Sequence, residues 1–593
     1  MTESPILRLL REKPLTLALC FAVILIIAKA AVAALDMESA IVLMGNDDVT
    51  RLLMVRDLIA GQGWYDTIQY RFAPPEGVDI HWSRYIDLGI AAIIVPLSWF
   101  MPMQSAEILG AMIWPTVIFL ITIFVMAYGA RRLFGPVPAA FTVLATVLWP
   151  LTADLHSSAG NLDHHNVQML MMILLTFAVI WPTRPVAAGI VGGLAAGFSL
   201  STGLESLLYI IAAGGVFLGR SAFDRSPATD RLLLAFCASL LFGSLVFWAG
   251  LIPPSRMLQP VCDQFGTPAI SLILVAVVAS VLPVLVLKDR GGAFGRLGAA
   301  VVLTGIGLAL AWPLLGPCLA GPYGNLPEDL QLLMTTRITE AKPGLVYMGT
   351  HTIAAMILLI PVFVAFVAGL IWWVANRGRK DRVHATMGLL LIISTFGIAM
   401  IFVQMRTVIM LAPVVPLIGG VVIAALLHRY LEKRDIGSAI LMLLTAVAIS
   451  APRTIAEPLR PFLQNTVKEA TLSELACRDY ESITVLNEIP PAILMTHGNF
   501  GPTLVWATHH DSMASGYHRS ATSIGHALRT FSLEEEAFRD ALLSSPAEFL
   551  HLCRGYGYDR NFLRALAAEE KRVDWLRPVP LESDLQMLFE VVR

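Results

Sequence analysis

The sequence predicts an all-α polytopic membrane domain followed by a small soluble α/β domain, and three observations support this fold class. Hydrophobic residues make up 56% of the 593 residues and charged residues only 15%, whereas soluble domains carry about 25% charged residues. Many apolar runs are close to the ~20 residues that cross a ~30 Å hydrocarbon core. After about residue 453 the long apolar runs end and short strand-like segments begin. The net charge of −2 excludes the basic signature of a nucleic-acid-binding protein.

The loops that are rich in Lys and Arg predict the orientation of the spans, because such loops stay in the cytoplasm. Six basic loops lie at 131–132, 183–184, 220–231, 288–296, 377–382 and 428–434. Thirteen spans separate them from the loops on the other side: 15–35, 106–130, 137–154, 166–182, 185–201, 204–219, 232–252, 268–287, 298–314, 351–375, 384–403, 407–427 and 436–452. We therefore expect a transmembrane domain over residues 1–452 in a bacterial inner (cytoplasmic) membrane, with a periplasmic domain over 453–593.

One apolar segment, 86–103, is not counted as a span. Counting it would move the basic loop at 131–132 to the outside and invert every later segment. We interpret it as an interfacial helix within the external loop 36–105. The first span lacks a small-residue cleavage site and is interpreted as retained rather than as a cleaved signal.

The soluble tail alternates helix-like and strand-like segments. Residues 481–488 are predicted to be helical, and strands are predicted at 492–496, 512–515, 549–553 and 587–592. The apolar segment 503–507 lies between the first two strands.

Acidic residues and histidines recur in the loops predicted to be external. Asp47 follows the first span, Asp163 and His165 stand two residues apart in the second external loop, and Glu340 lies in the external loop 315–350. Each alone would be an ordinary polar loop residue. Because all four fall on one side, we expect them to share a divalent cation, which carboxylate and imidazole groups bind. Asp48 has no such role here and is interpreted as a helix cap.

Several other polar residues leave two interpretations open. Arg406, at the outer end of a span, either snorkels to the interface or clamps a phosphate. Glu205 either caps a helix or contacts a sugar hydroxyl. Further substrate contacts are expected from the end of the first external loop and from the end of a tail strand: His81, Trp82, Arg84, Tyr517, His518 and Arg519.

Four of the six cysteines are predicted to be external, which allows two disulfides in an oxidising compartment. They are Cys262, Cys318, Cys477 and Cys553. The sequence leaves their pairing open.

These motifs resemble the GT-C glycosyltransferases, and specifically the single-subunit oligosaccharyltransferases of bacteria and archaea. Asn46-Asp47 with Arg56-Asp57 is similar to the family's catalytic acidic motif, and Asp163-His164-His165 to its Asp-x-His metal motif. Ile338-Thr339-Glu340 is similar to the family's glutamate motif in the fifth external loop, and Arg406 to the arginine that contacts the lipid-linked pyrophosphate. The resemblance covers roughly residues 1–450.

The resemblance implies a metal-dependent, inverting enzyme that transfers a sugar or oligosaccharide from a polyprenyl-(pyro)phosphate donor. It implies Asp47 and Glu340 as catalytic residues, Asp47, Asp163 and His165 as ligands of Mn²⁺ or Mg²⁺, and Arg406 as the donor-phosphate contact. The expected partners are the lipid bilayer, the lipid-linked donor and an acceptor that is a protein, a lipid or a glycan, and we expect a monomer.

The tail departs from the family pattern. The family's Trp-Trp-Asp-Tyr-Gly motif, which holds the acceptor, corresponds to Thr496-His497-Gly498-Asn499-Phe500-Gly501. Acceptors other than an Asn-linked sequon therefore stay open. A secondary transporter is a second interpretation, but its ionisable residues would lie in broken helices at the bilayer midplane, whereas these acids lie in loops. A non-catalytic scaffold is a third, but it would not need three separate acidic motifs.

Overall fold

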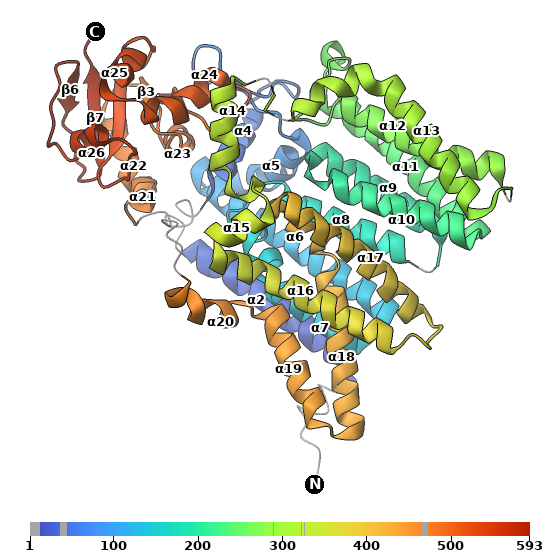
Figure 1. The fold of residues 1–593 in the computed structure, drawn as a ribbon. Helices are drawn as coiled ribbons and strands as arrows, with labels where there is room; N and C mark the ends of the chain where they lie inside the picture. The colour runs from blue at the N-terminus through green and yellow to red at the C-terminus, as the bar shows by residue number, and fades with distance from the viewer. Residues whose placement is uncertain are drawn as a thin grey trace.

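The computed structural model describes residues 12–35, 44–181, 183–288, 290–321, 323–324, 326–463 and 472–593. Each of the thirteen predicted spans overlaps one helix of a large bundle (Figure 1): α2 (Pro14–Leu35), α6 (Met103–Phe134), α7 (Pro136–Leu148), α8 (His165–Ile180), α9 (Pro185–Thr202), α10 (Leu207–Asp224), α11 (Pro227–Leu251), α12 (Thr267–Leu287), α13 (Gly292–Leu315), α16 (Thr352–Ala375), α17 (Arg382–Val403), α18 (Val415–Lys433) and α19 (Ile436–Ser450).

The helical membrane fold is confirmed. Within the described ranges, ten helices are long and apolar enough to cross a membrane. An eleventh is reached if α19 and the helical segment after it, which bend by 96° at Ala451–Pro452, count as one span. The helices α7 and α8 are apolar but shorter. The chain is thus a multi-pass membrane protein, and the number thirteen stays a prediction.

One predicted boundary is wrong. The span expected at 407–427 begins as a 3₁₀ helix, Met405–Leu411, and α18 starts only at Val415. Pro413 and Pro416 explain the break, because Pro413 lacks the amide hydrogen that would continue the helical hydrogen bonds and Pro416 lies in the first turn of α18, where proline is tolerated.

Close helix packing in the bundle depends on small residues. Between α9 and α11, a Cβ added to Gly193 would lie 2.5 Å from the Phe236 carbonyl oxygen. Such contacts let two helix backbones approach closely in a membrane, where burial of apolar surface gives no driving force between helices. At the edge of the bundle, α13 buries only Arg296 and Ala300.

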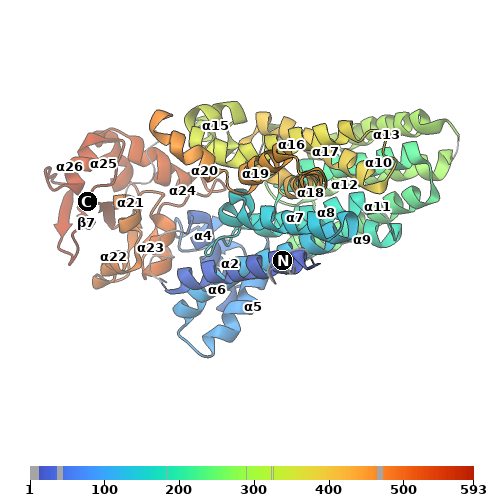
Figure 2. The ribbon, with the colours of Figure 1, turned by 90° about the horizontal axis from the view of Figure 1, so that it is seen from below.

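The two ends of the bundle differ. In Figure 1 the turns α12–α13, α16–α17 and α18–α19, which contain three of the predicted basic loops, lie at the right and the bottom, and the C-terminal domain lies at the upper left. Figure 2 likewise shows the domain beyond one end of the bundle. Near the domain lie α4 (Asn46–Ile59), α5 (Arg84–Ser98), α14 (Glu328–Arg337), α15 (Gly344–Thr350), β1 (Ile68–Gln69) and β2 (Val78–Asp79). The interfacial helix expected at 86–103 corresponds to α5.

The C-terminal domain contains a five-stranded mixed sheet of order β4-β3-β5-β7-β6. In it β3 runs parallel to β4 and β5, and β7 runs antiparallel to β5 and β6. The strands are β3 (Ile493–Met495), β4 (Asp511–Ser512), β5 (Phe549–Cys553), β6 (Leu576–Val579) and β7 (Gln586–Val591). The helices are α21 (Leu472–Cys477), α22 (Tyr480–Thr484), α23 (Gly501–Ala507), α24 (Ala521–Ile524), α25 (Glu535–Leu543) and α26 (Asn561–Ala567). The short helix α20 (Arg453–Ala456) packs against α16 of the bundle instead (Figure 1).

The domain continues into the first external loop. Ser512 on β4 exchanges backbone hydrogen bonds with this loop, donating to the Arg71 carbonyl (3.0 Å) and accepting from the Ala73 amide (2.8 Å). The Arg71 guanidinium donates to the carbonyls of Val505, Thr508 and His510. One apolar cluster contains buried residues of α4, α5 and the sheet. The start of α4 is therefore held between the bundle and the domain.

Candidate active site

The helix α4 presents two carboxylates at its first turn, and they face different partners. Asp48 Oδ2 accepts a hydrogen bond from the Gly45 amide at 2.9 Å, which caps the helix. Asp48 Oδ1 accepts from the Leu162 amide at 2.7 Å and from the Asp163 amide at 3.0 Å. Asp48 thus joins α4 to the second external loop, in addition to the capping role expected from the sequence.

Asp47 is placed differently. Among the described residues no hydrogen bond to its carboxylate is present, and the residue is exposed to the space between the loops. The protein that surrounds it removes water and, with the charges of Asp163 and Glu340, raises the pKa of Asp47 to about 6. Burial and the Asp163 charge raise the pKa of Asp48 to about 7. Convergent carboxylates of this kind are typical of a cation site.

The second external loop gathers its own ligand groups. Asp163 Oδ2 lies 2.6 Å from His165 Nδ1, and Asp163 Oδ1 accepts from the His164 amide at 2.7 Å. One ligand atom from each of these three residues lies within 4.8 Å of the others. The His156 ring stacks on His165 with centroids 5.2 Å apart. Burial alone would raise the pKa of Asp163, but His164 and His165 outweigh it and hold that pKa well below its usual range.

His164 forms a second charged pair behind this loop. Its Nε2 lies 3.3 Å from Glu205 Oε2, and Gln168 Nε2 donates to the same oxygen at 3.3 Å. A Cβ on Gly203 would lie 2.5 Å from His164 Nε2, so only glycine permits this approach. Burial lowers the pKa of His164, but Asp163 and Glu205 raise it to about 10. The pair therefore presents an imidazolium beside Asp163, and Glu205 orients it rather than capping a helix.

Glu340, whose charge acts on Asp47, lies near Arg406. Arg406 Nη2 lies 3.8 Å from Glu340 Oε1, and its side chain also bonds to the Tyr323 hydroxyl. The buried Arg406 Nε has no hydrogen-bond partner. The Met405 amide donates to the Lys342 carbonyl at 2.9 Å, which ties the 3₁₀ helix to the loop that carries Glu340.

The end of the first external loop is held by a buried charge network that the sequence did not predict. Arg51, on α4, donates to Asp87 Oδ1 at 3.0 Å, lies 4.0 Å from Asp163 Oδ1 and covers the Trp82 ring at 4.4 Å. Arg84 is 1% exposed and bonds to Asp87, Gln62 and the Met54 carbonyl. Arg84 therefore orders the loop and is not available to a substrate, contrary to the expected substrate contact. Trp82 is half-buried against the Arg51 guanidinium.

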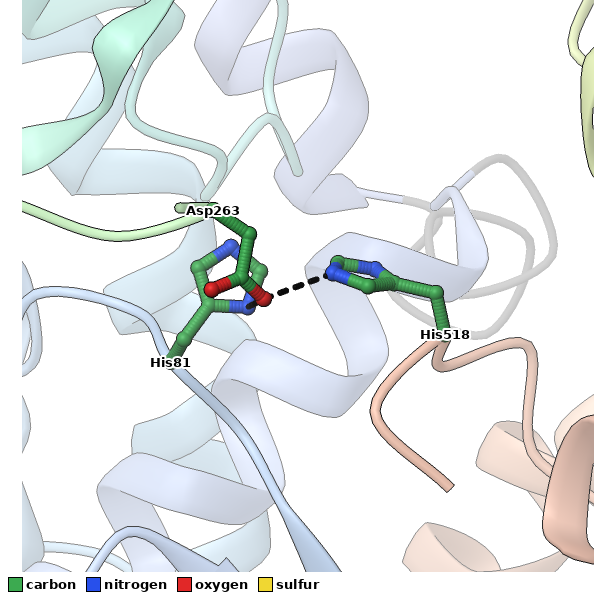
Figure 3. A group of neighbouring side chains, drawn as sticks. All are labelled: His81, Asp263 and His518. Atoms are coloured by element: carbon green, nitrogen blue, oxygen red, sulfur yellow. Dashed lines mark hydrogen bonds and ion pairs between the residues drawn. The ribbon is translucent and has the colours of Figure 1, made fainter. Parts of the chain in front are cut away.

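The C-terminal domain contributes Tyr517, His518 and Arg519. The Tyr517 ring contacts Trp82 with centroids 5.0 Å apart. Burial, with the nearby charge of Asp47, raises the pKa of Tyr517 well above its usual value. His81 and His518 flank Asp263 (Figure 3). Burial lowers the pKa of His81 to about 3.

Two disulfides are present in the described ranges. Cys262 pairs with Cys318 and Cys477 with Cys553, with Cα atoms 5.2 Å and 6.1 Å apart. The first joins the loop that carries Asp263 to the loop that leads to Glu340, and the second closes the C-terminal domain.

No family model and no curated protein sequence matches this chain, but solved structures match its fold. One is the archaeal oligosaccharyltransferase AglB from Archaeoglobus fulgidus in complex with an inhibitory peptide and a dolichol-phosphate, with a TM-score of 0.64, 14% identity, 89% coverage of this chain and 69% of that chain. The same enzyme tethered to an acceptor peptide with the NVT sequon matches with a TM-score of 0.57, 13% identity and coverage of 96% and 74%. The complex of that enzyme with Zn and sulfate matches with a TM-score of 0.53 and 14% identity, covering 88% of this chain and 67% of that chain. The chain therefore has the GT-C fold.

Proposed function

We propose that this protein is a membrane glycosyltransferase that moves a sugar or oligosaccharide from a polyprenyl-(pyro)phosphate donor to an acceptor on the periplasmic side. One observation carries the proposal: Asp47, Asp163 and Glu340, from three loops far apart in the sequence, interact electrostatically on one side of a GT-C bundle. Three carboxylates that act on one another repel unless a cation lies among them, and carboxylates with shifted pKa values cluster at functional sites. The membrane fold supports a donor whose lipid tail stays in the bilayer.

The residues present fit a divalent ion. Asp163 Oδ2 and His165 Nδ1 point at one another, and Asp47 has an accessible carboxylate without a hydrogen-bond donor among the described residues. These carboxylate and imidazole donors suit Mn²⁺ and other divalent ions, and the related archaeal enzyme was solved with Zn and sulfate. Asp47, Asp163 and His165 would hold the ion. When bound, it would act as a Lewis acid on the oxygen of the departing phosphate.

One cationic side chain, Arg406, would contact the donor phosphate directly, and a buried imidazolium, His164, would act on it at a distance. Arg406 holds a buried Nε without a partner, reaches Glu340 only at 3.8 Å and bonds to the Tyr323 hydroxyl. Its planar fork would bind two phosphate oxygens in place of these contacts. The His164 imidazolium is buried, and its ring nitrogens face Asp163 and Glu205, so its charge would act from behind Asp163 and not by direct contact. Both would stabilise the negative charge that grows on the leaving phosphate.

The acceptor would attack the anomeric carbon from the face opposite the phosphate. The bond from that carbon to the phosphate oxygen breaks as the new glycosidic bond forms, and the configuration inverts. Asp47 and Glu340 would polarise the nucleophile or accept its proton as the new bond forms. Glu340 is exposed and Asp47 faces open space, which suits groups that meet an incoming acceptor.

The test is transfer from a radiolabelled polyprenyl-linked sugar by the purified protein. We expect Asp47→Ala, Asp163→Ala and Glu340→Ala to abolish transfer in protein that still inserts and folds. Glu328→Ala is the matched control, because Glu328 is an exposed glutamate of the same loop. Wild-type transfer that persists after complete chelation would reject the metal role. Uptake of substrate into proteoliposomes without sugar transfer would reject the proposed transferase activity and favour a transporter.

The acceptor class is the second question. The turn 496–501, which replaces the family's acceptor motif, packs against the active-site helix, with Asn46 Nδ2 donating to the Gly498 carbonyl at 3.4 Å. Asn499 donates to the Tyr556 hydroxyl at 3.1 Å. This turn lacks the tryptophans and the aspartate, which supports a lipid or glycan acceptor alongside a protein. Mass spectrometry of periplasmic glycoproteins and lipids from a deletion strain decides between them.

A further inference from the structure

Three loops bring two imidazoles and a carboxylate together at the seam between the C-terminal domain and the membrane domain (Figure 3). His518 Nε2 lies 2.8 Å from Asp263 Oδ2, and His81 Nδ1 lies 3.9 Å from the same oxygen. One ligand atom from each residue lies within 4.8 Å of the others. Zinc bonds of about 2.0–2.2 Å in a tetrahedron place ligand atoms about 3.3–3.6 Å apart. The His518–Asp263 distance is a hydrogen bond, shorter than this spacing, and the His81–Asp263 distance is longer, so the ion would draw His81 in and separate the other pair slightly.

A second observation points to a ligand at this place. His81 Nδ1 is buried and has no hydrogen-bond partner, and an unpartnered buried ring nitrogen costs free energy unless something binds it. Asp263 and His518 also line a cavity of about 320 Å³. That cavity leaves room for a water molecule as a fourth ligand.

We propose that His81, Asp263 and His518 bind a divalent transition-metal ion, Zn²⁺ in the first instance, which fastens the C-terminal domain to the external loops. Two imidazoles with one carboxylate are a donor set that zinc accepts. The three ligands come from the first external loop, the loop 253–267 and the domain. The ion would therefore act as a bridge between elements that are separate in the sequence, and it is distinct from the catalytic ion proposed above.

The surroundings hold Asp263 in position for this role. Arg519 donates through Nε to Asp263 Oδ2 at 2.7 Å and through Nη2 to Asp263 Oδ1 at 2.8 Å. Ligating carboxylates commonly accept such outer hydrogen bonds. Arg519 also donates to Asp79 Oδ2 at 2.8 Å, so Asp79 offsets part of the arginine charge. The adjacent Cys262–Cys318 disulfide restrains the loop.

The experiment counts metal ions in the full-length protein in detergent. The protein is stripped with a chelator, loaded with Zn²⁺ or Co²⁺, dialysed and analysed for bound metal. We expect two ions in the wild type and one in His518→Gln and in His81→Gln, since glutamine keeps a polar side chain of similar reach. His509→Gln is the control, because His509 lies outside the cluster on the same domain and should leave two ions. Asp163→Asn, combined with His165→Gln, should leave one.

The last variant keeps the test independent of folding at the seam, because it leaves all three proposed ligands intact. X-ray absorption of its zinc form should show two imidazole nitrogens at about 2.0–2.1 Å. The inference is overturned if that variant binds no metal, or if His518→Gln and His81→Gln retain as many ions as the wild type. A single ion in the wild type that is lost in both His518→Gln and His81→Gln and kept in the Asp163→Asn, His165→Gln variant would support this site and reject the catalytic ion.

Discussion

Asp48 offers the sharpest test of how the site is assembled. Its two oxygens accept three backbone hydrogen bonds, and two of the donors, the Leu162 and Asp163 amides, belong to the loop that carries the proposed metal ligands. In Asp48→Ala these two amides lose their acceptor. An unsatisfied buried donor costs about 1–3 kcal/mol, so we expect a loss of roughly 2–6 kcal/mol in the free energy of unfolding. Asp48→Asn keeps one acceptor oxygen for the loop and should lose about 1 kcal/mol, as a weakened helix cap does.

Activity should follow the same order. A loop shifted by about 1 Å costs about 100-fold in rate, so Asp48→Ala should transfer sugar about 100-fold more slowly, with Asp48→Asn closer to the wild type. The measurements are thermal unfolding in detergent and initial rates with a lipid-linked sugar. Asp381→Ala is the control: Asp381 caps α17 through the His384 amide at 2.9 Å, at the opposite end of the bundle from the site. Wild-type rate and stability in Asp48→Ala would refute the bridging role.

Three further expectations concern other parts of the molecule. Arg406→Lys keeps the charge but loses the fork, so transfer should fall about 10–100-fold, as expected for one or two hydrogen bonds to a charged group; an unchanged donor KM and kcat would contradict the phosphate contact. Burial lowers the pKa of His551 to about 4, so the unfolded chain takes up a proton between about pH 6.5 and 4 and the native state does not. Stability should therefore fall by about 3 kcal/mol as the pH drops through this range, and the stability gap between wild type and His551→Gln should narrow correspondingly in denaturant titrations. Replacing Cys477 and Cys553 by serine should cost about 2–5 kcal/mol, measured by thermal unfolding; an equal melting temperature would count against a stabilising bridge.

Much of the fold was predictable because apolar length and basic loops are local signals. Ten helices that can cross a membrane match predicted spans, and the strand predicted at 549–553 is β5. The strand β6 escaped prediction because Pro578 makes a short run unlike a strand, although an edge strand tolerates proline. The segment 503–507 is helical, in α23. The sequence left its state undecided, because an apolar run that short does not distinguish helix from strand.

The candidate site was predictable only in part. Acids and histidines in external loops stand out against an apolar chain, which is how Asp163 and Glu340 were found. The roles of Asp48 and Arg51 were missed because they depend on partners far away in the chain: Asp48 reaches a loop 114 residues on. Arg51 is completely buried against Asp87, and the residue types alone do not distinguish a buried ion pair from a solvated one.

The seam between Arg519 and the external loops also has a consequence for biosynthesis. Every ligand proposed for the catalytic ion is inserted before residue 170, and Arg406 follows well before the tail. Tyr517 and Arg519 close over Trp82, Asp79 and Asp263, and in the proposed topology they cross the membrane after all of these groups. If the proposed topology and activity hold, a nascent chain carries its reactive groups through the membrane before the C-terminal domain that covers them. We then expect transfer activity to appear only after that domain has been exported and has docked.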